Sequence, residues 1–464
     1  MTFSSIPFIF QFLPATLITY YIVPRKLKNL ILLLASLVFY AWGGIRYLPA
    51  MILLIIVNYL AALFINHFSD RPTQKKLLLI SAVIISLGIL FFFRYFDFTL
   101  HRISVIFSLG VLPSKLPLPF GISFYTLQLL SYTIDVYRGR CDVQKNLIFL
   151  STYAVMFPQL IAGPIVRYTD ISDELQNRTI TADKLEAGME DFIIGLTRKV
   201  FIADNIGQLW AEVSDVGVYS VSTPLAWFGI LAFALQIYFD FSGYSQMAIG
   251  LARMMGFTLP QNFENPYTAR SVTEFWRRWH ITLVAWFREY LYFPLGGSRR
   301  GNARTIMNLF ILWSLIGLWH GATWNYVLWG LSFFLLLTIE KTGFISFLNK
   351  HAIFSHIYMI LTLLVSWTFF ATSDLPSSLE FIKRMFFPTS LIYGSSTVGV
   401  AYYLRNYAII ASIGCLFSTS LPTKIYGKIR QKRGIKLTIL SFLFLLSIAY
   451  IIDSNNNPFL YFRF

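Results

Sequence analysis

Residues 305–339 read TIMNLFILWSLIGLWHGATWNYVLWGLSFFLLLTI and contain no Asp, Glu, Lys or Arg. A helix that spans a bilayer needs about 20 mostly apolar residues, so this run is too long for one span. We expect it to break near residues 317–321, where two glycines lie, into two membrane helices. Both should be helical, because lipid offers no hydrogen-bond partner to an open backbone.

The rest of the chain has the same apolar character. Its 464 residues are 56% hydrophobic and 13% charged, with a mean hydropathy of +0.61, whereas soluble domains are about 45–50% apolar and about 25% charged. This excludes a cytosolic enzyme, a secreted disulfide scaffold and a disordered regulator. We predict a single all-α polytopic integral membrane domain over 1–464, with roughly 10–12 spans and a re-entrant or tilted stretch at 120–132. The candidate spans are 7–23, 30–42, 47–65, 77–93, 147–166, 225–251, 305–339 (two), 356–372, 407–420 and 437–452.

The formal charge of +16 comes from 38 Lys and Arg residues scattered among these runs. Such residues mark cytoplasmic loops and contacts with anionic membrane lipids, so no nucleic acid partner is expected. Basic loops at 25–28, 71–76 and 424–436 place the N-terminus and the tail 453–464 outside. The first run lacks a basic start and a cleavage site, so we interpret it as a retained span. Cys141 and Cys415 provide neither a disulfide framework nor a metal cluster.

Two histidines lie in unusual surroundings. His320 lies near the middle of the charge-free run, where an ionisable side chain is costly and suggests function; burial should keep it neutral and able to accept a proton. A histidine that only bonds two helices together is the alternative. His280 lies in EFWRRWHITLVAWFREY (274–290), whose periodicity predicts one amphipathic helix in the membrane interface. With Arg299, Arg300 and Arg304 this helix forms a basic patch for lipid phosphates or a phosphorylated donor; simple lipid anchoring is the alternative.

Other polar groups interrupt apolar runs. We interpret Asp240 and Asp135 as structural carboxylates paired with Arg253 or Arg138, and Gln128 as a structural polar residue, although each could orient a histidine. Residues 167–191 suggest a surface loop with a short amphipathic helix. Motifs of the GxSxG, P-loop and HExxH types are absent from the sequence, so their chemistries have no support.

Several motifs together resemble one family. PFGISFY (119–125), FPQLIAGPI (157–165), YFDFSGY (238–244), QNFENPY (261–267), the 276–297 block and GLWHGATW (317–324) follow one another as in the membrane-bound O-acyltransferase family. The resemblance extends along the whole chain and is greatest to the branch that O-acetylates alginate or peptidoglycan. It implies a helical shell around a thin floor, a cytoplasmic funnel and a tunnel holding a histidine. By position, His320 matches the catalytic histidine and His280 a second functional polar residue. Donor-binding residues are then expected at Asn262, Trp276, Arg277, Arg278, Trp279 and Trp319.

The resemblance implies an acetyltransferase of the bacterial inner membrane. It would take acetyl from cytoplasmic acetyl-CoA, without a tightly bound cofactor or a metal, for O-acetylation of a cell-surface or secreted polysaccharide. Coenzyme A is too polar to cross hydrocarbon, whereas an acetyl group can move through a tunnel. His320 would act as general base, and His280 would position the thioester or help to protonate the leaving thiolate.

The tail PFLYFRF (458–464) resembles a terminal aromatic motif of the same branch. It suggests Tyr461 as an acyl relay to an extracytoplasmic SGNH-type transferase; an aromatic residue at the membrane interface is the alternative. Three other functions stay open at this point. They are a D-alanyl exporter for teichoic acids, a proton-coupled transporter using His320 and Asp240, and a scaffold for a partner enzyme.

Overall fold

The computed structural model describes residues 1–110, 118–388 and 397–453. Every regular element among these residues is a helix, which confirms the predicted all-α class. The chain folds into two compact units. Unit 1 comprises Met1–Phe192 and Tyr244–Gln261, and unit 2 comprises Ile193–Gly243 and Asn262–Phe464.

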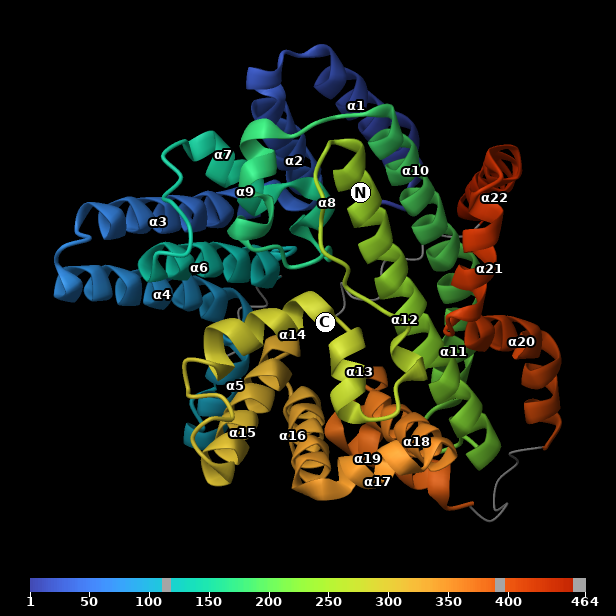
Figure 1. Cartoon of the computed structure of the whole chain (residues 1–464). Coiled ribbons are helices and arrows are strands. Elements are labelled where there is room, and N and C mark those ends of the chain that lie inside the picture. The colour runs from blue at the N-terminus through green and yellow to red at the C-terminus, as the bar shows by residue number, and fades with distance from the viewer. Residues whose placement is uncertain (111–117, 389–396, 454–464) are drawn as a thin grey trace. The chain divides into compact units, whose positions relative to one another are not determined.

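Unit 1 contains the helices of the first part of the chain (Figure 1). They are η1 (Phe8–Phe12), α1 (Leu13–Ile22), η2 (Arg25–Leu27), α2 (Lys28–Gly44), η3 (Ile45–Tyr47), α3 (Leu48–His67), α4 (Pro72–Arg94), α5 (Phe96–Phe107), α6 (Ile122–Arg138), α7 (Leu147–Val155), α8 (Phe157–Leu160), α9 (Tyr168–Asn177) and most of α10 (Ala182–Thr197).

Unit 2 contains most of α12 and all later helices that the structure describes. They are η4 (Arg198–Asp204), α11 (Asn205–Val216), α12 (Thr223–Met254), η5 (Pro266–Thr268), α13 (Val272–Arg278), α14 (Ile281–Phe287), η6 (Arg288–Tyr292), α15 (Asn302–His320), α16 (Trp324–Ile339), η7 (Glu340–Phe344), α17 (Ile345–Lys350), α18 (Ala352–Ala371), α19 (Leu375–Phe386), α20 (Thr397–Phe417), α21 (Leu421–Arg430) and α22 (Arg433–Asp453).

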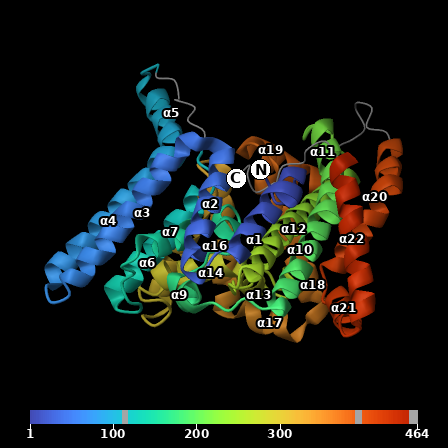
Figure 2. The ribbon, with the colours of Figure 1, turned by 90° about the horizontal axis from the view of Figure 1, so that it is seen from above.

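In unit 1, helices α3, α4 and α6 pack side by side (Figures 1 and 2). A fully buried amide joins them, because Asn58 Nδ2 on α3 donates to Ser86 Oγ on α4 at 3.0 Å. Asn58 Oδ1 accepts from Thr133 Oγ1 on α6 at 2.7 Å. Paired polar side chains of this kind hold apolar helices together where hydrophobic contrast between helix and surroundings is weak.

In unit 2, the charge-free run forms two helices, α15 and α16, as predicted. Glycines let their backbones approach closely: a Cβ on Gly317 would lie 2.4 Å from Tyr326 O, and one on Gly330 would lie 2.3 Å from Trp313 O. Small residues at such contacts are typical of helices packed in membranes. The α15–α16 pair is therefore a rigid support for His320 at its turn.

Seven segments of the described chain are long and apolar enough to cross a membrane, fewer than the roughly 10–12 predicted. One of them contains two helices, α2 and α3, and other expected spans are too short or too polar; 147–166, for example, divides into α7 and α8. The stretch 120–132 lies mostly in α6, a largely buried helix. The seven segments are Arg25–His67, Pro72–Arg94, Thr223–Met254, Trp324–Lys350, Ala352–Ala371, Gly399–Phe417 and Arg433–Asp453.

The segment 167–191 was expected to be mainly a surface loop, and this expectation is wrong in extent. It contains α9 and the first part of α10. Helix α9 buries Tyr168, Ile171 and Leu175, whose spacing places them on one helical face. Asp170 also caps the start of α9 by accepting from Arg167 N at 3.0 Å. A short apolar stripe and a cap were enough to form a packed helix.

Candidate active site

His320 is the last residue of α15 and is 6% exposed. Gly321 follows it with extended backbone, φ 174°, and α16 begins at Trp324. A Cβ on Gly321 would lie 2.4 Å from the Tyr326 ring, so packing and not backbone conformation requires glycine here. The tight turn places the imidazole where the two helices meet.

Aromatic rings surround His320. The centroids of Trp329 and Phe370 lie 5.0 and 5.1 Å from the imidazole centroid, with interplanar angles of 82° and 76°. Trp319, its neighbour in sequence, lies 4.9 Å away. The imidazole of His320 is thus packed closely against aromatic side chains.

The predicted single helix over 274–290 is wrong. The chain forms α13 and α14, which are separated at Trp279 and His280, and His280 adopts left-handed backbone angles, φ 44° and ψ 51°. The aromatic side chains of this stretch are buried in unit 2: Phe275 is 0% and His280 1% exposed. Periodicity gave the helical spacing correctly, but it carries no signal for one left-handed residue.

Residues far from α14 in sequence hold the His280 side chain. Asn262 Oδ1 lies 3.0 Å from His280 Nδ1, 2.9 Å from Thr282 Oγ1 and 3.3 Å from Thr282 N. The Phe241 ring packs on the imidazole edge-to-face at 4.8 Å. Burial lowers the pKa of His280 to about 3, so the ring is neutral at physiological pH.

Trp319 connects the two histidines. Its ring centroid lies 6.2 Å from that of His280 and 4.9 Å from that of His320. Both imidazoles therefore belong to one group in unit 2, which we call the histidine cluster. It consists of His280, His320, Asn262, Phe241, Phe263, Trp319, Trp329 and Phe370.

The cluster continues into a group of three tryptophans whose rings pack at steep angles, 60–80°. Trp276 of α13 lies 4.7 Å from Trp313 and 5.6 Å from Trp329. Among the described residues, no hydrogen-bond partner is found for the buried indole N–H of Trp276, Trp313 or Trp329. Buried tryptophans normally pair this group. The three indole N–H groups are therefore buried donors without a hydrogen-bond acceptor among the described residues.

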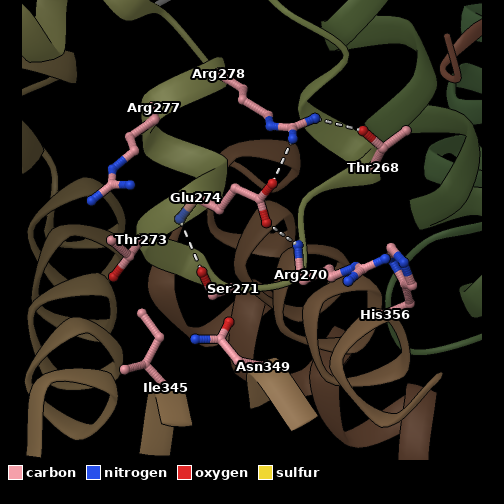
Figure 3. A pocket seen from close by; sticks show the side chains of 10 residues that line it. All are labelled: Thr268, Arg270, Ser271, Thr273, Glu274, Arg277, Arg278, Ile345, Asn349 and His356. Carbon is pink, nitrogen blue, oxygen red and sulfur yellow. Dashed lines mark hydrogen bonds and ion pairs between the residues drawn. The ribbon is translucent and has the colours of Figure 1, made fainter. Parts of the chain in front are cut away.

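The other face of α13 borders an open pocket of about 760 Å³, which we call the basic pocket (Figure 3). Helices α17 and α18 complete it. Its lining side chains are Thr268, Arg270, Ser271, Thr273, Glu274, Arg277, Arg278, Ile345, Asn349 and His356.

The arginines of the basic pocket differ in their partners. Arg278 turns toward Glu274 and Thr268, with donor–acceptor distances of 2.5 and 2.8 Å, whereas Arg277 points away from Glu274 (Figure 3). Within the part of the chain that the structure describes, neither the Arg277 nor the Arg270 guanidinium forms an ion pair or hydrogen bond. Two exposed cationic groups thus remain available to an anion.

A buried carboxylate fixes α13. Glu340, which is fully buried in η7, accepts from Val272 N at 2.6 Å and from Thr273 N and Oγ1 at 2.8 and 2.6 Å. These N–H groups belong to the first turn of α13 and have no partner within the helix. Glu340 therefore couples the end of α16 to the helix that carries Trp276 on one face and Arg277 on the other.

The structure separates the six predicted donor-binding residues into two groups. Arg277 and Arg278 line the basic pocket. Asn262 and Trp319 belong to the histidine cluster, Trp276 continues it, and Trp279 packs at 5.1 Å on Trp367. Arg299, Arg300 and Arg304 do not line the pocket. Sequence reasoning missed Thr282, Glu340, Asn349 and His356, because their roles depend on neighbours distant in the chain.

Of the remaining predicted positions, the two carboxylates lie near basic side chains, Gln128 is buried and Tyr461 is not described. Asp240 pairs with Lys199 at 3.2 Å, while Arg253 pairs with Asp191, so the predicted pairing of Asp240 with Arg253 is wrong. Lys199 also contacts Asp204. Asp135 lies 3.9 Å from Arg140, and Gln128 is fully buried. Tyr461 lies outside the described residues.

Comparison with known proteins gives consistent matches. Residues 142–372 match the family model of MBOAT, the membrane-bound O-acyltransferase family. The chain is 42% identical to the probable alginate O-acetylase AlgI of Pseudomonas syringae pv. tomato, over 89% of this chain and 82% of that protein. It is 38% identical to the probable alginate O-acetylase AlgI of Pseudomonas putida, over the full length of both. It is 35% identical to the peptidoglycan O-acetyltransferase of Helicobacter pylori, over 83% of this chain and 80% of that protein.

Proposed function

Because the chain belongs to the membrane-bound O-acyltransferase family, as a multi-pass membrane acyltransferase, we propose that it uses cytoplasmic acetyl-CoA to O-acetylate a cell-surface or secreted polysaccharide. The acetyl group would cross the bacterial inner membrane through this chain. The relatives from Pseudomonas and Helicobacter are named for alginate and peptidoglycan. Polymers of these two kinds are therefore the first acceptors to test.

One observation carries this proposal: α13 has the histidine cluster on one face and the basic pocket on the other. The first region is buried and mainly aromatic, and the second is open and cationic. A donor with a charged nucleotide end and a small acyl end requires both environments close together. Glu340 holds α13 in place between them.

The basic pocket supports coenzyme A as the carrier of the acetyl group. Coenzyme A has several phosphate charges, and arginine is suited to phosphate because its planar fork forms paired, charge-assisted hydrogen bonds. Arg270 and Arg277 are the two arginines of the pocket whose guanidinium groups remain available within the described chain. The distribution of basic loops predicts that this side of unit 2 faces the cytoplasm.

The histidine cluster supports acyl transfer by acid–base catalysis. His320 would take the proton of the attacking hydroxyl as its oxygen forms a bond to the thioester carbon. When the C–S bond breaks, the proton passes to sulfur, so no net proton is consumed. His280 would position the thioester or assist this proton transfer. General acid–base catalysis typically contributes a factor of about 10² to 10⁴.

Delivery outside would use Tyr461 as a relay to an exported SGNH-type transferase. The predicted topology supports this step because it places the tail 453–464 on the far side of the membrane. In a Tyr461→Phe variant, polymer acetylation should be lost while the protein remains folded, because phenylalanine has no hydroxyl to accept the acetyl group. Wild-type acetylation of the polymer in that variant would exclude the relay.

The function can be tested with membranes that contain this chain and acetyl-CoA labelled in the acetyl group. Label should pass to the polymer with the wild-type chain and not with His320→Ala. His67→Ala is the matched control, because His67 is an exposed histidine in the last turn of α3. Equal labelling by wild type and His320→Ala would contradict the proposed base.

Mass spectrometry of the modified polymer completes this test. An acetyl ester supports the proposed function. A D-alanyl ester, which carries a free amine, would instead make the chain an exporter of D-alanine for teichoic acids. Flux of a solute or of protons without turnover of acetyl-CoA would point to a transporter.

A further inference from the structure

Asn262 lies in an irregular segment that is hydrogen-bonded to the break between α13 and α14. Ile281 N donates to Asn262 O at 3.0 Å, and Glu264 N donates to Arg278 O at 2.9 Å. These two bonds hold residues 262–264 alongside the turn that contains His280. The left-handed backbone of His280 is strained for a residue with a side chain, and strain of this kind persists where the surroundings fix it.

The atom of Asn262 that faces His280 is the amide oxygen. Thr282 N lies 3.3 Å from the same atom, and a backbone N–H can only donate. The Thr282 hydroxyl lies 2.9 Å from it. If the NH₂ group of Asn262 stood at this position instead, two donors, the amide NH₂ and the Thr282 N–H, would face each other with no acceptor between them. Because the oxygen can only accept, His280 Nδ1 at 3.0 Å must carry the proton of that hydrogen bond.

A neutral imidazole has one N–H, so a proton on Nδ1 leaves Nε2 as the nitrogen with the lone pair. The ring is neutral because burial lowers the pKa of His280 to about 3. The rings packed on it, Phe241, Phe263 and Trp319, carry no charge that would favour an imidazolium. The bond to Asn262 therefore selects one tautomer of a neutral ring.

We infer that Asn262 is a positioning residue, which holds His280 protonated on Nδ1 so that Nε2 takes part in acyl transfer as a hydrogen-bond acceptor. This inference rests on the proposed function and narrows the role of His280. A resting Nε2 has no proton to give to the leaving sulfur. The proton that leaves with the thiol is then the one that His320 removes from the acceptor hydroxyl, as the C–O bond forms and the C–S bond breaks.

The tautomer can be measured directly in the resting protein. The full chain, labelled with ¹⁵N-histidine and reconstituted in lipid bilayers, is compared with His280→Gln to assign the His280 signals in solid-state NMR. At neutral pH we expect a protonated Nδ1 and an unprotonated Nε2. A protonated Nε2, or an imidazolium, would overturn the inference. This result does not depend on acetyl-CoA, so it can stand even if the proposed function fails.

Variants then connect the tautomer with catalysis. Asn262→Leu removes the acceptor and should populate the Nε2–H tautomer, with kcat about 10- to 100-fold lower, as is typical for loss of a residue that orients a functional histidine. KM for acetyl-CoA should stay near the wild-type value. Asn308→Leu is the matched control, since Asn308 is another fully buried asparagine of unit 2 with two hydrogen bonds to backbone carbonyls. Its His280 tautomer should not change.

The variant Asn262→Asp keeps an acceptor oxygen for His280 Nδ1 but adds a negative charge. A carboxylate keeps the acceptor oxygen, so His280 should remain protonated on Nδ1 and kcat should recover toward wild type. Its charge also favours the imidazolium, so the acidic limb of the kcat profile should move up by about 1 to 3 pH units. A purely structural role predicts no such movement. An unmoved profile, or an unchanged tautomer and kcat in Asn262→Leu, would contradict the inference.

Discussion

The histidine cluster and the basic pocket differ in exposure and charge, although one short helix, α13, borders both. In the histidine cluster His280 and His320 are 1% and 6% exposed, and rings surround them. In the basic pocket Arg270, Arg277 and Asn349 are exposed to solvent. Apolar surroundings suit a base that must stay neutral, and open cationic surroundings suit recognition of phosphate. The two faces of α13 thus present opposite environments, and the proposed function assigns catalysis to the buried one and donor recognition to the open one.

The largest effect should come from the histidine cluster. His320→Ala should lower kcat by about 10² to 10⁴, because it removes the proposed general base, while KM for acetyl-CoA stays nearly constant. Initial rates of acetyl-CoA hydrolysis or polymer acetylation, measured over a range of donor concentrations, separate the two parameters. A change in KM alone would contradict the proposal that the histidine cluster serves catalysis and the basic pocket serves donor binding.

The second effect should come from the basic pocket and should change KM for acetyl-CoA. Loss of Arg270 and Arg277 together, as Ala, should raise KM for acetyl-CoA about 10- to 100-fold, since hydrogen bonds to charged groups contribute about 1.5–3 kcal/mol. The wild-type KM should also rise with salt. The double variant Arg299→Ala/Arg300→Ala is the control, because these exposed arginines lie outside the pocket. An equal rise in the control would mean that net charge alone attracts the donor.

A third change concerns the support of the histidine cluster. Gly317→Ala places a Cβ 2.4 Å from Tyr326 O, so α15 and α16 must separate, and we expect a loss of about 1–3 kcal/mol in the free energy of unfolding. Thermal unfolding in detergent should show a lower midpoint. Gly399→Ala in α20 is the matched control, since nothing lies within 4 Å of the added Cβ. A midpoint unchanged in Gly317→Ala would mean that the close helix contact is not needed.

The fourth effect is a dependence of stability on pH. The pKa of His280 is lowered to about 3 in the folded state, below the ordinary value of about 6.5. Only the unfolded state therefore binds a proton between these values, and stability falls as pH falls below about 6.5. Between pH 7.5 and pH 5 the loss is about 2 kcal/mol.

Unfolding of wild type and His280→Gln at pH 7.5 and pH 5 measures this contribution. His280→Gln should lose less stability on acidification than wild type does. Asn308→Leu provides the control, because it should lower stability to the same extent at both pH values. Identical acid sensitivity in wild type and His280→Gln would mean that the buried imidazole is not held neutral.

Some of the site could be predicted from the sequence. The break after His320 follows from a charge-free run too long for one span, and the structure places it at Gly321. Arg277 and Arg278 were predicted to bind the donor and do line the basic pocket. The predicted continuous helix over 274–290 fails at Trp279 and His280, because the left-handed conformation of His280 is held by bonds from residues 262–264. Helical periodicity contains no information on that segment.

The sequence by itself determined the membrane class and drew attention to two histidines, because hydropathy and the depth of an ionisable group can be read from consecutive residues. Tertiary structure decided which groups act together. Asn262 meets His280, Glu340 meets Thr273, and Asn349 and His356 join the pocket of Arg277. These partners are separated by 18 to about 80 positions in the chain, and only the packing of separate segments brings them within hydrogen-bond distance or around one pocket.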